Sequence, residues 1–286
     1  MIPAAFDYVA PRTIPEAVAE LVKRGQEAKV LAGGHSLIPL MKLRLSTPSF
    51  LVDIGRIGNL NYIREDDGHI AVGALTTHHD IALSDLVKSK LPLLSSAAEQ
   101  IGDPQVRNRG TIGGAAAHAD PFGDFPTTLL ALDAEFRVVG ERGERTIAAK
   151  DFFVDTFTSA LEPAEIVREI RIPTPPAGSA GTYLKFSRRS QDWAIVAVAA
   201  QVTMNGHEVS RVAIGLTGMG NTPLRASGVE QALRGKGGHD DELRQAAEHA
   251  DEGTDPPQDL NGSPDYRRHL ARVLTRRALE KVTAHH

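Results

Sequence analysis

The sequence predicts an α+β fold in two domains, and three observations lead to this prediction. Short apolar segments and a helical pattern alternate over residues 1–55. Paired strand patterns with helical patterns between them occupy residues 56–176. A segment rich in proline and glycine then precedes more strand patterns and a helical tail. We therefore expect one domain at residues 1–176, in subdomains of about 1–55 and 56–176, and a second domain at 177–286.

The first subdomain is predicted from one helix and two strands. Thr13-Ile14-Pro15-Glu16 is typical of a helix start, because threonine and glutamate form a capping box and proline suits the first turn. Apolar residues at helical spacing follow until Gly25, which ends the helix. The segments 29–31 and 51–54 are short apolar strands. Together these elements indicate a small α/β unit.

The second subdomain is predicted as an antiparallel sheet with helices. Asp67-Gly68 separates two strand patterns, 61–64 and 69–72, which is a strong hairpin signal. A glycine-rich stretch at 110–123 is expected to form a loop. The other predicted elements are helices at 79–87 and 91–101, a hairpin joining 135–139 to 145–148, and a strand at 165–172.

The boundary between the two domains lies within the segment Pro173 to Gly181, the best boundary candidate in the chain. Asn205-Gly206 is a hairpin signal within the second domain, and residues 252–262 form a polar loop. The predicted elements are strands at 182–186, 195–204 and 209–215 and helices at 241–250 and 264–282.

Composition excludes several classes of function. The formal net charge of −4 gives no reason to expect nucleic-acid binding, which usually needs a basic face. Cysteine is absent, so disulfides, thiolate nucleophiles and cysteine-ligated clusters are excluded within this chain. No apolar run approaches the ~20 residues that span a bilayer, and the N-terminal segment does not resemble a secretory signal. We expect a cytoplasmic protein. The terminal His285 and His286 are given no role.

Two glycine segments are candidates for binding a ligand. Ala32-Gly33-Gly34-His35-Ser36 follows a strand, and its glycines permit backbone N–H groups to approach an anion such as a pyrophosphate. A plain glycine turn is the alternative. Thr111-Ile112-Gly113-Gly114-Ala115 is a second strand-to-glycine loop. Two such segments in one chain indicate one extended ligand held at two points.

Polar residues around the second glycine segment have competing interpretations. Asp124 is either the N-cap of a helix or a carboxylate that accepts hydrogen bonds from sugar hydroxyls. His118 and Asp120 are possible metal ligands, but no matching cluster elsewhere supports a metal site. Arg107 and Arg109 attract phosphate or belong to a solvated loop.

Two residues of the second domain are further candidates. Lys185 alternates with apolar residues on a strand, so it contacts a ligand or points to solvent. Trp193 is the only tryptophan, and it is either part of the core or a flat surface for a planar ring. No catalytic triad or carboxylate pair is evident, so we assign no catalytic residue.

The chain resembles the FAD-binding medium subunits of molybdenum hydroxylases, and among them those of aerobic carbon monoxide dehydrogenases. The resemblance is carried by AGGHSLIPLMKLRL at 32–45 and TIGGAAAHADPFGDFP at 111–126, and it extends from Met1 to about Arg277. It implies the p-cresol methylhydroxylase-type FAD-binding fold in two subdomains. It also implies a small α+β C-terminal flavoprotein domain.

The resemblance also implies a set of residues that bind FAD without a covalent link. It places 32–36 and 111–115 around the pyrophosphate, Asp124 at the ribose or ribityl hydroxyls, and Trp193 against the isoalloxazine. This chain has Ala115 where the family usually has asparagine, which removes one side-chain hydrogen bond worth ~1 kcal/mol. The implied residues are Ala32, Gly33, Gly34, His35, Ser36, Ile101, Thr111, Gly113, Gly114, Ala115, His118, Asp120, Asp124, Val167, Lys185 and Trp193.

The resemblance further implies a division of labour among subunits. A large subunit would carry the molybdenum cofactor and a small subunit two [2Fe–2S] clusters, in a dimer of heterotrimers. This chain would accept electrons from the clusters and pass them to an external acceptor, in a complex that oxidises carbon monoxide. The nearest alternative is a stand-alone FAD-dependent oxidoreductase of the same fold, and a non-enzymatic binding module is another. A nicotinamide-type Rossmann enzyme is disfavoured because its glycine fingerprint is absent.

Overall fold

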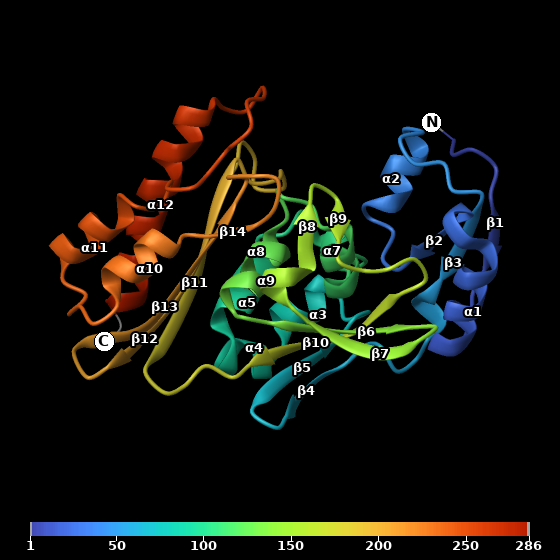
Figure 1. Ribbon diagram of the computed structural model, residues 1–286, viewed down its shortest axis with the longest axis horizontal. Helices are drawn as coiled ribbons and strands as arrows, with labels where there is room; N and C mark the ends of the chain where they lie inside the picture. Colours follow the sequence, from blue (N-terminus) through green and yellow to red (C-terminus); the bar gives the residue numbers. More distant parts are fainter. Residues whose placement is uncertain (1, 285–286) are drawn as a thin grey trace.

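The computed structural model describes residues 2–284, so the two terminal histidines lie outside the described residues. The fold is α+β, as predicted from the sequence. Sheets of three, five and four strands follow one another along the molecule, and helices pack against each of them (Figure 1). A two-stranded sheet is formed by β8 (Phe153–Asp155) and β9 (Thr158–Ser159). None of the described helices is long and apolar enough to cross a membrane.

The three-stranded sheet is parallel, in the order β1 (Asp7–Val9), β3 (Phe50–Asp53), β2 (Ala28–Leu31). Helix α1 (Ile14–Arg24) buries its apolar side against this sheet, and the Thr13 hydroxyl caps it by accepting from the Glu16 N–H at 3.3 Å. The Glu16 carboxylate accepts from the Arg12 N–H at 2.9 Å instead of the Thr13 N–H that a capping box would use. The short elements are 3₁₀ turns at Gly25–Glu27 and Ile54–Arg56 and helix α2 (Leu37–Lys42).

The five-stranded sheet is antiparallel, and the order of its strands is β4-β5-β10-β6-β7. The two predicted hairpins supply four of its strands, and the returning strand β10 pairs in the middle. Its strands are β4 (Ile63–Asp66), β5 (His69–Gly73), β6 (Glu135–Gly140), β7 (Gly143–Ala148) and β10 (Ile166–Pro173). Asp67 and Gly68 both have positive φ, which is what the tight turn between β4 and β5 requires.

The helices of this region differ from the prediction in the following respects, and the four-residue helix at Ala149–Phe152 was not predicted either. The predicted helix at 79–87 is two helices, because Ser84 leaves the helical conformation and its hydroxyl caps the second one. A short helix at Pro104–Arg107 was not predicted, and the glycine-rich stretch contains a helix instead of a loop. The helices are α3 (His78–Leu83), α4 (Asp85–Lys90), α5 (Pro92–Glu99), α6 (Pro104–Arg107), α7 (Ile112–His118), α8 (Asp124–Ala131) and α9 (Ala149–Phe152).

The four-stranded sheet lies between two layers of helices. Helices α5 and α8 pack on one face, and the C-terminal helices cover the other (Figure 1). Its strands are β11 (Ser179–Phe186), β12 (Val196–Asn205), β13 (Glu208–Thr217) and β14 (Leu224–Arg225). The C-terminal helices are α10 (Ser227–Leu233), α11 (Asp240–Ala247) and α12 (Pro264–Thr283), of which α10 was not predicted. Tyr183 of β11 belongs to the same apolar core as β5, β10, α5 and α8.

Candidate cofactor-binding site

The first glycine segment has four backbone donors that find no partner among the residues that the structure describes. It connects β2 to α2, and Gly34 has φ of 79°. Within residues 2–284 the N–H groups of Gly33, Gly34, His35 and Ser36 donate to no protein acceptor. The first hydrogen bond beyond them runs from the Ile38 N–H to the Gly34 carbonyl at 3.0 Å. A run of unpaired N–H groups at a loop is suited to an anion.

The second glycine segment has a different structure from the loop we predicted. Thr111 is the N-cap of α7, and its hydroxyl accepts from the Gly114 N–H at 3.2 Å. The Gly113 N–H donates to the Ala74 carbonyl at 2.9 Å, and the Ala115 N–H donates to the Thr111 carbonyl at 2.9 Å. The segment is helical because a capping threonine and a run of alanines outweigh the two glycines. It therefore contributes a surface of small side chains, and its amides are already used within the protein.

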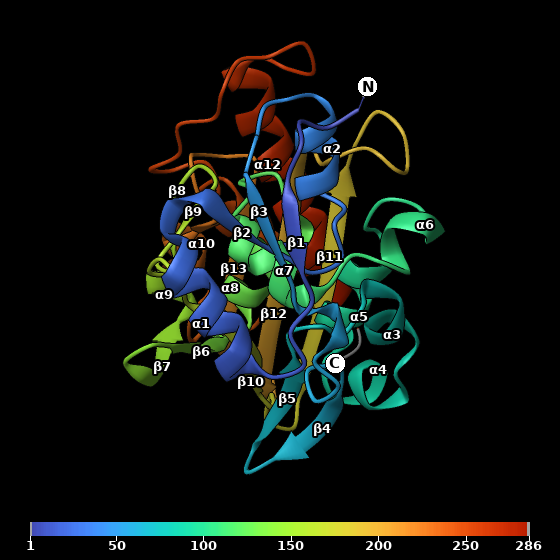
Figure 2. The same cartoon turned by 90° about the vertical axis from the view of Figure 1, so that its right-hand side faces the viewer.

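The two glycine segments lie against each other. A Cβ atom on Gly33 would lie 2.0 Å from the carbonyl oxygen of Arg109, so only glycine fits there. A Cβ on Gly114 would lie 3.8 Å from the Cβ of Ala32, which is ordinary contact. Figure 2 views the molecule with the three-stranded sheet toward the reader, and α7 lies behind that sheet. The donors of the first segment and the small residues of the second therefore lie side by side, which is the arrangement that a ligand held at two points would need.

A support segment, Ala74–His78, holds the second glycine segment in place. It follows β5, and its backbone pairs with residues 110–113. The His78 N–H donates to the Gly110 carbonyl at 3.0 Å, and the Ile112 N–H donates to the Thr76 carbonyl at 3.1 Å. Thr77 and Thr111 form an isolated β-bridge between them. We did not predict this segment, because it has no glycine or charge pattern and its role depends on pairing with a distant part of the chain.

His78 lies at the junction of both glycine segments and α8. Its ring packs edge-on against Phe125 with centroids 4.9 Å apart, and Gly110 leaves room for it. Burial, together with the nearby His35 and Arg107, lowers the pKa of His78 to about 3. Its Nδ1 atom is buried without a hydrogen-bond partner in the described part of the chain. His78 is therefore a neutral imidazole that links the parts of the site.

Asp124 is not the helix cap that we considered, because Gly123 is the N-cap of α8 and Asp124 is its first residue. Lys185 does not point to solvent either: its Nζ atom lies 3.1 Å from Asp124 Oδ2 and donates to the Gln100 carbonyl at 3.1 Å. Tyr183 Oη donates to Asp124 Oδ1 at 2.7 Å. Burial raises the pKa of the Asp124 carboxyl, and Lys185 and Tyr183 oppose that rise. Asp124 is thus a buried carboxylate shared between α8 and β11.

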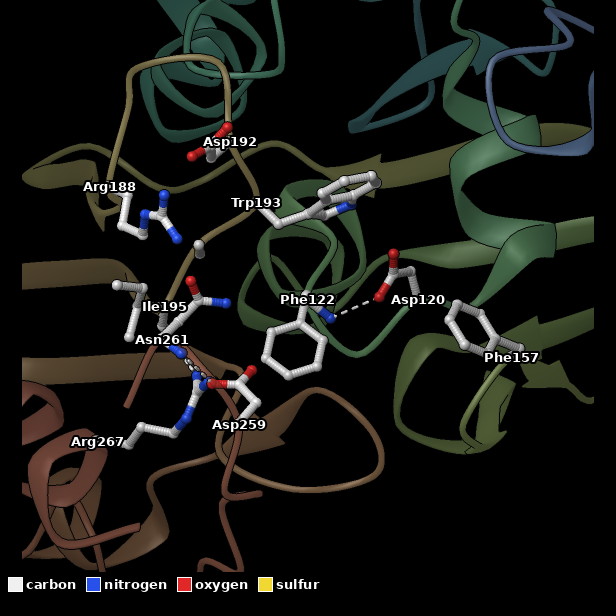
Figure 3. Close-up of a pocket in the computed structure, with 11 residues that line it drawn as sticks. Asp120, Phe122, Phe157, Arg188, Asp192, Trp193, Ile195, Asp259, Asn261 and Arg267 are labelled. Atoms are coloured by element: carbon white, nitrogen blue, oxygen red, sulfur yellow. Dashed lines mark hydrogen bonds and ion pairs between the residues drawn. The ribbon is translucent and has the colours of Figure 1, made fainter. Parts of the chain in front are cut away.

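Trp193 is not part of the core, because 70% of its surface is exposed. It lines a pocket of about 360 Å³, with Trp193 and Asp120 at one end and Arg267 at the other (Figure 3). Asp120 is half-buried; burial raises its pKa, while the Phe122 N–H at 2.9 Å and the Trp193 indole stabilise the charged form. The remaining lining residues are Phe122, Phe157, Arg188, Asp192, Ala194, Ile195, Asp259 and Asn261.

The other predicted site residues are less central. Ile101 is half-buried, and its carbonyl accepts from Arg107 Nη1 at 3.0 Å, so Arg107 stabilises its own loop. His118 ends α7, and its ring lies 5.0 Å from that of Phe157. Val167 is in the apolar core of the five-stranded sheet, opposite Val138, so its side chain is covered by protein. Among the described residues, no three His, Cys, Asp or Glu side chains gather as metal ligands.

Two family models match the chain. Residues 4–175 match the FAD binding domain in molybdopterin dehydrogenase, and residues 181–282 match the CO dehydrogenase flavoprotein C-terminal domain. The chain is 42% identical over 284 residues to the carbon monoxide dehydrogenase medium chain of Hydrogenophaga pseudoflava, covering 99% of each. It is 39% identical over 282 residues to the glyceraldehyde dehydrogenase medium chain of Sulfolobus acidocaldarius, covering 99% of this chain and 100% of the relative.

Solved structures give the same result. Carbon monoxide dehydrogenase from Hydrogenophaga pseudoflava lacking the Mo-pyranopterin moiety superposes with a TM-score of 0.97 at 44% identity, covering 99% of each chain. Quinoline 2-oxidoreductase from Pseudomonas putida 86 superposes with a TM-score of 0.94 at 32% identity, also covering 99% of each chain. The likeness therefore extends over nearly the whole chain.

Proposed function

Because this chain belongs to the FAD-binding medium subunits of molybdenum hydroxylases, we propose that it binds FAD non-covalently and transfers electrons within a carbon monoxide dehydrogenase complex. The observation that carries the proposal is the set of N–H groups from Gly33 to Ser36 that have no acceptor in the described part of the chain. Four adjacent donors beside a surface of small side chains suit the pyrophosphate of a dinucleotide. The residues present therefore fit FAD.

The remaining residues divide the binding of FAD among them. Gly114 has no side chain and Ala115 only a methyl group, so a ligand next to the donors can approach the backbone of α7 closely. Asp124 offers a fixed carboxylate for sugar hydroxyls. Trp193 offers an exposed flat surface for a planar ring system. FAD supplies the redox chemistry, because a flavin takes up electrons one at a time and gives them up singly or in pairs.

The chain's own residues position FAD and do not transform a substrate. We assign partners accordingly: a large subunit with the molybdenum cofactor, where carbon monoxide is oxidised, and a small subunit with [2Fe–2S] clusters, in a dimer of heterotrimers. The relatives support the assignment to carbon monoxide, because the medium chains at 42% and 43% identity both come from carbon monoxide dehydrogenases. A glyceraldehyde dehydrogenase medium chain at 39% identity supplies the competing substrate class.

Two measurements test the proposal. The purified chain should bind one equivalent of FAD and release it on acid precipitation, and colour left in the pellet would contradict non-covalent binding. The chain with FAD alone should not oxidise carbon monoxide or aldehydes, and its flavin should be bleached by carbon monoxide only when the partner subunits are added. Substrate turnover by the chain alone would favour the stand-alone oxidoreductase, and bleaching by glyceraldehyde but not carbon monoxide would reassign the substrate.

A further inference from the structure

The Asp124 carboxylate is held by two residues of one strand. Tyr183 Oη donates to Oδ1 at 2.7 Å and Lys185 Nζ donates to Oδ2 at 3.1 Å. Tyr183 and Lys185 are two positions apart on β11, so both side chains project from the same face of the sheet. Tyr183 is 1% exposed, and the side chains of Lys185 and Asp124 are 4% and 7% exposed. Each carboxylate oxygen thus has one fixed donor in a site that is largely buried.

Gln100 fixes β11 against the helices, so the two donors cannot shift independently. The Gln100 side-chain amide donates to the Tyr183 backbone carbonyl at 3.0 Å. The Gln100 backbone carbonyl accepts from Lys185 Nζ at 3.1 Å. The same residue therefore anchors both donors at the end of α5. A carboxylate with donors in fixed positions on both oxygens has a fixed plane.

We propose that Tyr183 is a positioning residue for FAD binding. From the four-stranded sheet it orients the Asp124 carboxylate, which in turn contacts FAD. This inference rests on the proposed FAD binding. Each carboxylate oxygen accepts about two hydrogen bonds, so one accepting position on each remains after Tyr183 and Lys185 are counted. The plane of the carboxylate, which Tyr183 and Lys185 fix, sets the direction of these remaining accepting positions. A sugar or ribityl hydroxyl of FAD is a donor that suits them.

Tyr183 also keeps the carboxylate in the form that accepts. The charged and titratable groups that act on Asp124 are Lys185 and Tyr183 from β11, which favour its charged form, and Asp120 before α8, which disfavours it. Loss of the Tyr183 hydroxyl removes one of the two favourable contributions and leaves the burial unchanged. The Asp124 pKa then rises, and protonation converts an acceptor for the sugar hydroxyl into a competing donor.

The test is the affinity of the full-length chain for FAD between pH 5 and 9, measured by flavin fluorescence. Tyr183→Phe should raise the Kd about tenfold at pH 7, since it removes a hydrogen bond to a charged group, and should move the acid limb of the profile to higher pH. Tyr62→Phe is the matched control, because the Tyr62 hydroxyl also donates to a carboxylate. Its acceptor is Glu169 Oε2, 2.6 Å away in the five-stranded sheet. This control substitution should lower the melting temperature and leave the Kd and its pH profile unchanged.

A second substitution covers the case in which Tyr183→Phe does not fold. Tyr183→3-fluorotyrosine keeps the shape and donates more strongly, so the acid limb should move to lower pH. If the wild-type chain binds FAD and both variants reproduce its Kd and pH profile, Tyr183 is purely structural and the inference is overturned while the proposed function stands. If the wild-type chain does not bind FAD, the proposed function fails and the inference fails with it.

Discussion

Gly33 packs so closely against the carbonyl oxygen of Arg109 that a Cβ atom on residue 33 would lie 2.0 Å from that oxygen. Gly33→Ala must therefore push the two glycine segments apart, and such overpacking costs about 1–3 kcal/mol of stability. We expect FAD binding to be lost or weakened more than a hundredfold, because the donors and the small-residue surface no longer face each other. Titration with FAD measures this. Gly58→Ala is the control, since nothing lies within 4 Å of its added Cβ; equal Kd values for both variants would contradict the placement of the site.

The Asp124–Lys185 pair should show strong coupling in unfolding experiments. Lys185→Met leaves a buried carboxylate without its counter-charge, and breaking a buried pair in this way costs about 3–5 kcal/mol. The double variant with Asp124→Asn removes the stranded charge, so it should cost less than the sum of the two single variants. Urea unfolding of the wild-type chain, the two single variants and the double variant gives the coupling free energy between the two residues. Simple additivity would mean that the pair is solvated and does not hold α8 to β11.

His78 should make the protein less stable in mild acid. Its pKa is lowered from 6.5 to about 3 on folding, so between these values the unfolded chain binds more protons than the folded one. Stability is therefore complete above pH 6.5 and falls by up to about 1.4 kcal/mol per pH unit as the pH drops toward 3. His78→Gln removes this titration and should flatten that part of the profile in urea unfolding. An unchanged slope would mean that the imidazole is accessible to protons in the folded state.

Replacing Ala115 with the asparagine usual in the family should tighten FAD binding and weaken the helix. A recovered side-chain hydrogen bond of ~1 kcal/mol corresponds to about a fivefold lower Kd. Asparagine is a poorer helix former than alanine by roughly 0.5 kcal/mol, so the FAD-free chain should melt slightly earlier. Ala117→Asn carries the same helix cost on the exposed part of α7. A gain in affinity shared by both variants would argue against a specific contact at position 115.

Trp193 should report directly on FAD binding. It is the only tryptophan, and its exposure lets its emission respond to a planar ring placed against it. We expect added FAD to quench this emission. Trp193→Ala should change the unfolding free energy by less than about 0.5 kcal/mol, yet alter the Kd or the reduction potential of the bound flavin. Leu260→Ala removes another exposed apolar side chain and should change neither; unchanged emission on saturation with FAD would remove Trp193 from the site.

Local signals explain which elements were predictable. Helix α1 has a capping threonine, a first-turn proline and a terminal glycine, all within its own segment. The hairpin at Asp67-Gly68 is equally local, since both residues adopt the positive φ that the turn requires. Helix α7 was missed because two glycines favour a loop, while the pairing of Gly113 with Ala74 that fixes its start lies outside any local window.

The residues of the candidate site could be recognised in the sequence, but the hydrogen bonds and contacts that join them could not. Both glycine segments could be found from their residues, but which of them supplies free donors depends on hydrogen bonds made elsewhere. The sequence left Asp124 as a cap or a ligand because its partners, Tyr183 and Lys185, are 59 and 61 residues away. His78 had no signal of its own, and its lowered pKa follows from burial that only the assembled fold produces.

Because Tyr183 packs into the core formed by β5, β10, α5 and α8, the two domains are joined by buried contacts as well as by the linker before β11. Residues 176–178 are exposed, and they offer a protease an accessible peptide bond. A single cut there would separate the chain covalently but leave the buried Asp124–Lys185 pair and the packing of α5 and α8 on the four-stranded sheet intact. The two fragments should therefore migrate together on a native gel and part only under denaturing conditions.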